Sequence, residues 1–163
     1  MRATRAISVC AVLLTLASAD LGFAEPTRPK YTTLVVEFVG EMDRPVPPVV
    51  ISTSHEEGEW YKQHLFPEPG HFPVHVQVVP PSVLNEITEL PLLERALKSA
   101  KPMDDEPKTT QNVRFTAGVG HHRAQIMVDA ETSTKILKDI LRIVDKYPDL
   151  KSELQEIEDH VRP

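Results

Sequence analysis

A change of hydrophobic period between residues 111 and 146 constrains the fold more than any other feature of this sequence. From Gln111 to Val128, apolar residues alternate with polar ones on both sides of a Gly-Val-Gly turn, as two half-buried strands require. Asp129 then suits a helix N-cap, because its carboxylate can accept hydrogen bonds from first-turn backbone N–H groups. Apolar residues follow at helical spacing: Ile136, Leu137, Ile140, Leu141 and Val144. The sequence therefore predicts a β-hairpin that leads directly into an amphipathic helix.

The first 24 residues have the pattern of a secretory signal peptide. Arg2 and Arg5 precede a short apolar run, and small residues allow cleavage after Ala19 or Ala24. The apolar run is shorter than the roughly 20 residues that span a bilayer, so we interpret it as a cleaved leader and not as a transmembrane anchor. We expect an exported protein, periplasmic or extracellular, whose mature part is a single domain over residues 25–163.

Charge and cysteine content exclude several kinds of partner and site. The chain has 24 acidic and 18 basic residues, which disfavours nucleic acid and anionic membranes as partners, because both would repel it. Cys10 is the only cysteine, and it lies in the expected leader. The mature protein therefore has no thiol for a disulfide, a metal ligand or a nucleophile, and its stability depends on its hydrophobic core.

The remaining elements are expected on both sides of a long loop. Alternating β-branched and aromatic residues predict three further strands, at 31–39, 49–54 and 72–79. Two short amphipathic helices follow, one capped by Ser82 and one restarted by Pro91 in its first turn, and a last helix ends the chain. Residues 55–71 have no clean period, so we expect a long loop there, of the kind that often carries function.

These elements together predict an α+β fold, a mostly antiparallel sheet of about five strands with helices packed on one face. The strands at 31–39 and 49–54 are expected to pair as neighbours. An alternative for the third strand is a parallel pairing with the strand that starts near residue 111, made through a right-handed helical crossover.

Seven histidines are the most suggestive chemical feature of the chain. His71 and His75 would share one face of an extended strand, and His121 or His122 from a strand turn could join them around a divalent metal at about 2.0 to 2.1 Å. However, no HExxH motif is present, and Pro73 disturbs the strand geometry that His71 needs. Scattered surface histidines remain the alternative, and the sequence requires no cofactor.

Two surfaces are candidates for binding a protein or a small ligand. Trp60 and Tyr61 lie in the expected loop, and the hairpin turn carries His121, His122 and Arg123 against an acidic background. Each surface has a structural alternative. Large aromatic side chains mostly serve burial, and a hairpin tip in solvent needs no ligand.

No catalytic residues are identified. The chain has no Gly-x-Ser-x-Gly elbow of a serine hydrolase. Gly118-Val119-Gly120 is followed by a strand, whereas a dinucleotide-binding loop leads into a helix. We therefore expect a non-enzymatic binding or interaction module. A histidine-based metal-binding protein or metalloenzyme, and a hydrolase without a recognisable motif, are the alternatives.

Overall fold

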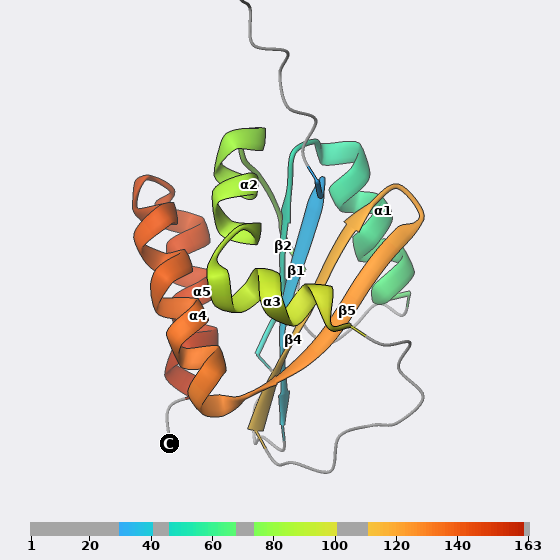
Figure 1. The fold of residues 1–163 in the computed structure, drawn as a ribbon. Coiled ribbons are helices and arrows are strands. Elements are labelled where there is room, and N and C mark those ends of the chain that lie inside the picture. Colours follow the sequence, from blue (N-terminus) through green and yellow to red (C-terminus); the bar gives the residue numbers. More distant parts are fainter. Residues whose placement is uncertain (1–29, 41–45, 68–73, 101–110, 162–163) are drawn as a thin grey trace, which may run out of the picture.

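A five-stranded mixed sheet forms the centre of the computed structural model, which describes residues 30–40, 46–67, 74–100 and 111–161 (Figure 1). Its strands run in the order β3-β2-β1-β4-β5. β1 is antiparallel to β2 and β4, and β4 is antiparallel to β5, whereas β3 is parallel to β2. The predicted α+β class and mostly antiparallel sheet are confirmed. The strands are β1 (Thr33–Gly40), β2 (Val49–Ser52), β3 (Val76–Val78), β4 (Gln111–Val119) and β5 (His122–Asp129).

Alternating side chains give each face of the sheet its own apolar cluster. Leu34 and Val36 of β1 belong to the larger cluster, whereas Val35 between them points to the opposite face and packs with Val50 and Tyr61. Helix α1 (His55–Leu65) carries Tyr61 and covers this smaller cluster. The larger cluster is covered by α2 (Pro81–Thr88), α3 (Pro91–Lys98), α4 (Ala130–Ile143), the short 3-10 helix η1 (Val144–Lys146) and α5 (Pro148–Val161) (Figure 1).

Helix α1 corrects the expectation of a long loop over residues 55–71, of which 68–71 lie outside the described residues. The sequence pattern misses this helix because its fully buried positions are only Gly58 and Tyr61, which do not make an apolar stripe. The helix also supplies the crossover between the parallel strands β2 and β3. Because α1 packs on the face opposite the other helices, the expected confinement of helices to one face is not confirmed.

The hairpin and the helix that follows it form as the sequence predicts. β4 and β5 pair with Phe115 opposite Ile126, and both side chains lie in the larger cluster. Asp129 caps α4, since its Oδ1 accepts the backbone N–H of Thr132 at 2.9 Å. This hydrogen bond lowers the pKa of Asp129. The cap therefore sets the start of α4, and the apolar stripe sets the face that packs into the larger cluster.

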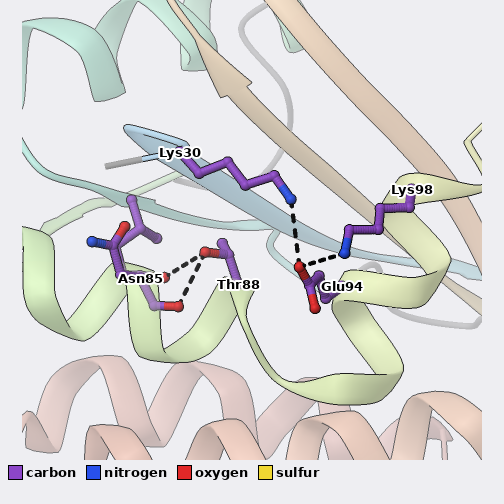
Figure 2. Close-up of polar contacts among 6 residues, drawn as sticks. Lys30, Asn85, Thr88, Glu94 and Lys98 are labelled. Atoms are coloured by element: carbon purple, nitrogen blue, oxygen red, sulfur yellow. Dashed lines mark hydrogen bonds and ion pairs between the residues drawn. The ribbon is translucent and has the colours of Figure 1, made fainter. Parts of the chain in front are cut away.

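Polar side chains lie near the corner between α2 and α3, where they bond within each helix and to the chain before β1 (Figure 2). Each helix begins with a proline at its first position, so Ser82, which was expected to cap α2, lies one residue inside it. The buried hydroxyl of Thr88 donates to two carbonyl oxygens of the preceding turn, at 3.0 and 3.2 Å. Glu94 contacts Nζ of Lys98 at 2.8 Å and Nζ of Lys30 at 3.7 Å (Figure 2). The chain that enters β1 is thereby linked to α3.

The described helices are all too short or too polar to span a bilayer. The expected leader, residues 1–24, lies outside the described residues.

Candidate functional site

The sheet order brings the start of α1 and the β4–β5 turn to the same end of the molecule. Thr33 in β1 pairs with Ser52 of β2 on one side and with Gly118 of β4 on the other. The chain leaves β2 at Ser52 and enters α1 after Ser54, while β4 turns immediately beyond Gly118. Two segments that are distant in sequence are therefore adjacent in space (Figure 1).

Two side chains of α1 hold the β4–β5 turn. The hydroxyl of Tyr61 donates to the backbone carbonyl oxygens of Gly120 at 3.0 Å and of His122 at 3.3 Å. Glu57 Oε1 accepts the backbone N–H of Gly120 at 2.9 Å, and it also accepts the hydroxyl of Thr32. The turn thus has both a donor and an acceptor from α1, which fixes its position against the helix.

The two glycines of the turn have different structural roles. A Cβ atom on Gly118 would lie 1.6 Å from Tyr61 Oη and 2.3 Å from Tyr61 Cζ, so only glycine leaves room for this ring. Gly120 has open space around it, but its φ of +54° is one that residues with a side chain rarely adopt. Turn geometry accounts for Gly120 alone, while Gly118 is required by the packing of α1.

Tyr61 is a structural donor and does not form an exposed binding surface. Its side chain is 1% exposed. The pKa of Tyr61 is raised to about 12, mainly by burial and also by the nearby carboxylate of Glu57, while Arg123 partly opposes both effects. The phenol therefore stays protonated at ordinary pH and keeps its hydrogen bonds to the turn.

Trp60, the neighbour of Tyr61 in α1, is only half buried and lies among other aromatic rings. The imidazole of His64 stacks on the indole with 3.9 Å between ring centroids and 23° between ring planes. The imidazole of His121 meets it at 5.1 Å and 68°, and the Tyr61 ring at 5.0 Å and 74°. His64 Nδ1 lies 2.7 Å from the Trp60 carbonyl oxygen, which holds this imidazole in place. The indole thus has a fixed position at the surface.

A hollow of about 330 Å³ opens between the start of α1 and the β4–β5 turn. Within the described ranges, neither Glu56 nor Glu57 forms an ion pair. Ser54 faces the hollow as the N-cap of α1, with its side-chain oxygen accepting the Glu57 backbone N–H at 3.3 Å. The residues lining the hollow are Ser54, Glu56, Glu57, Trp60, Gly120 and His121.

The structure places the two candidate surfaces that the sequence suggests next to each other. Trp60 and His121 both line the hollow, whereas His122 and Arg123 are exposed beside it at the start of β5. Sequence reasoning missed the contributions of Ser54 and of the two glutamates. A signal for them exists, because Ser54 followed three residues later by Glu57 has the spacing of a capping box.

The histidines proposed as metal ligands do not come together in the described residues. His75 precedes β3 at one edge of the sheet, while His121 and His122 lie at the turn into β5, the opposite edge strand. His71 lies outside the described residues. In the part of the chain that the structure describes, no group of three or more His, Cys, Asp or Glu side chains is arranged to hold a metal ion.

Two other hollows are weaker candidates. The larger, of about 640 Å³, lies along one stretch between Asp145 and His160, in which Lys151 pairs with Asp145. The smaller, of about 190 Å³, lies beside Glu153. Burial raises the pKa of Glu153, and a hydrogen bond from Gln77 partly opposes this rise. Among the described residues, neither lining contains an indole, phenol or phenyl ring, whereas the hollow beside Trp60 is lined by an indole.

Comparison of the chain with protein-family models, with curated proteins and with solved structures gives no match. Its function must therefore be argued from the geometry of the site.

Proposed function

We propose that this protein is an exported, non-enzymatic binding module whose ligand or partner contacts the hollow between α1 and the β4–β5 turn. The observation that carries this proposal is the half-buried Trp60 ring, placed between His64 and His121 at the edge of the hollow. Aromatic side chains at rigid concave surfaces are the residues that most often dominate binding free energy.

Preorganisation of the hollow supports a binding role. Tyr61 and Glu57 fix the turn by hydrogen bonds to its backbone, and these bonds hold His121 at the wall of the hollow. The positions of two walls are then set before binding, which reduces the free-energy cost of ordering loops when a ligand arrives.

The chemistry of the hollow supports binding over catalysis. In the described residues, no serine hydroxyl is hydrogen-bonded to an imidazole, and the Ser54 side chain accepts a backbone N–H instead. Tyr61 is held in its protonated form and is occupied as a donor. The proposed activity needs neither a metal nor a cofactor.

The export part of the proposal rests on the first 24 residues of the sequence, which combine basic residues, an apolar run and small residues. The partner is a protein or a small ligand of the cell envelope or exterior. An acidic chain with an acidic hollow disfavours nucleic acid. Fractionation of expressing cells, with determination of the mature N-terminus, tests export: an intact chain in the cytoplasm contradicts it.

Binding at the hollow can be tested by nuclear magnetic resonance on the ¹⁵N-labelled protein. The panel comprises an alkylammonium salt, an amidated arginine, sodium acetate, sodium phosphate, glucose and a neutral tripeptide. We expect at least one of these probes to shift the Trp60 indole N–H and the Gly120 amide signals together and saturably. If all probes leave both signals unchanged, or shift only signals on α5, the hollow is not a binding site. Turnover in an esterase or peptidase screen would contradict the non-enzymatic assignment.

A further inference from the structure

We infer that the hollow takes an organic cation, an alkylammonium or guanidinium group of the kind that ends a lysine or arginine side chain. The inference rests on the proposed function, because it names the ligand class of the same hollow. Three features of the lining support it: two carboxylates without an ion-pair partner among the described residues, a helix start with few free donors, and the Trp60 indole.

The carboxylates supply the negative charge. Among the described residues, Glu57 accepts hydrogen bonds from two neutral donors, the Gly120 N–H and the Thr32 hydroxyl, which do not neutralise its charge. Lys62, one turn further along α1, pairs with Glu59 at 3.3 Å instead. With Glu56 on the same rim, a bound cation would gain two favourable charge interactions.

An anion does not fit this helix start, although helix N-termini commonly bind anions. The backbone N–H of Glu57 donates to the Ser54 side chain, and that of Gly58 donates to the Ser54 carbonyl oxygen at 3.1 Å. Glu56 and Glu57 already place negative charge at the positive end of the helix dipole. An incoming anion would meet repulsion and few free donors.

The indole wall suits a cation on an aliphatic stem. An aromatic ring attracts a nearby cation through its quadrupole, and its apolar surface packs against methylene groups. His64 already stacks on one face of the indole, so a ligand would contact the part of Trp60 that lines the hollow. Arg123, the cationic side chain beside the hollow, is exposed to solvent, which screens its repulsion; the imidazoles of His64 and His121 are exposed as well.

Fluorescence provides a direct test, because Trp60 is the only tryptophan in the chain. The full-length protein is titrated at low salt with Nα-acetyl-lysine amide and Nα-acetyl-arginine amide, whose side chains keep their positive charge. Their neutral counterparts, N-acetyl-norleucine amide and N-acetyl-citrulline amide, and sodium acetate serve as comparison probes. We expect a saturable change with the two cations and none with the neutral or anionic probes. Butylammonium and a lysine-containing peptide then distinguish a free amine from a polypeptide side chain as the source of the cation.

Charge-removing variants locate the interaction. Glu56 is exposed and forms no hydrogen bond or ion pair within the described residues, so Glu56→Gln should fold normally and weaken the affinity for the cations by about 2- to 5-fold. Adding Glu57→Gln, which keeps an oxygen acceptor for the Gly120 N–H, should increase the loss to about 10-fold or more. Glu86→Gln makes the same charge change on an exposed position of α2 and should leave the affinity unchanged.

The inference is overturned if the norleucine probe binds as well as the lysine probe, or if Glu56→Gln binds the cations like the unmodified protein. It is also overturned if acetate or glucose shifts the Trp60 and Gly120 signals while the cations do not, although the hollow would then remain a binding site. If no probe of any class shifts those signals, the inference and the proposed function both fail.

Discussion

Substitution of Gly118 by alanine should destabilise the protein through one contact, with the ring of Tyr61. The new Cβ would lie 1.6 Å from Tyr61 Oη, whereas non-bonded heavy atoms pack at about 3.5 Å, so the ring must retreat by roughly 2 Å. The ring is 1% exposed and packs against Val35 and Val50, which leave it no free space. Overpacking of this kind costs about 1 to 3 kcal/mol, and loss of the hydrogen bond to the turn adds about 1 kcal/mol. We therefore expect Gly118→Ala to lower the free energy of unfolding by about 2 to 4 kcal/mol.

A double-mutant cycle separates this clash from any general effect of alanine in β4. In a Tyr61→Leu background the phenol ring is absent, so Gly118→Ala should cost less than about 0.5 kcal/mol. The control is Gly120→Ala, whose Cβ meets no atom within 4 Å but whose φ is +54°. Its cost should be about 1 kcal/mol from backbone strain, with no steric clash to relieve.

Urea unfolding followed by far-UV circular dichroism measures these free energies without relying on Trp60 fluorescence, which Tyr61 substitutions would also disturb. Two results would refute the reasoning. One is a Gly118→Ala variant within about 0.5 kcal/mol of the unmodified protein. The other is an equal cost of this substitution with and without the Tyr61 ring, because the destabilisation would then not arise from the contact described.

Three further substitutions test separate parts of the fold. Above pH 10, tyrosine in the unfolded chain loses its proton, while Tyr61 in the folded protein keeps its proton up to about pH 12. The free energy of unfolding should therefore fall as the pH rises through this range. Between about pH 9 and about pH 11, the Tyr61→Phe variant should lose less stability than the unmodified protein in urea titrations. Gly58→Ala places a Cβ 2.2 Å from Val76 Cγ1 and should cost about 1 to 3 kcal/mol, part of which Val76→Ala should recover in the same assay. Asp129→Ala removes the cap of α4 and should cost about 1 kcal/mol near neutral pH. Because its hydrogen bonds lower the pKa of Asp129, this cost should disappear in acid once the carboxylate is protonated, and an unchanged cost at low pH would contradict it.

The hairpin and α4 could be predicted because local sequence determines them. The alternation in β4 and β5, the cap at Asp129 and the 3.6-residue period each act within a few residues. Helix α1 lacks such a period, since one of its two fully buried positions is Gly58, which adds no apolar side chain. Its signal is the capping-box spacing of Ser54 and Glu57, which identifies the start of a helix but not its buried face.

The candidate site could be predicted only in pieces, because its assembly depends on strand order. The sequence singles out Trp60 and His121 separately, but no local pattern indicates that β1 lies between β2 and β4. That order makes Thr33 the neighbour of both Ser52 and Gly118, and the two pieces then meet. The same order places His75 and the hairpin turn at opposite edges of the sheet. Histidine spacing in the sequence cannot show this separation, so it suggested a metal site that the described residues do not assemble.

Trp60 and Tyr61 illustrate how consecutive residues of one helix acquire different roles. Successive side chains in an α-helix point about 100° apart. Because α1 buries Tyr61 against the sheet, Trp60 points toward the rim of the hollow. Tyr61 then fixes the β4–β5 turn, and the turn carries His121 against the indole. The exposed part of the site is thus positioned by its buried part. Loosening the turn with Tyr61→Phe should therefore weaken ligand binding even though Tyr61 does not line the hollow.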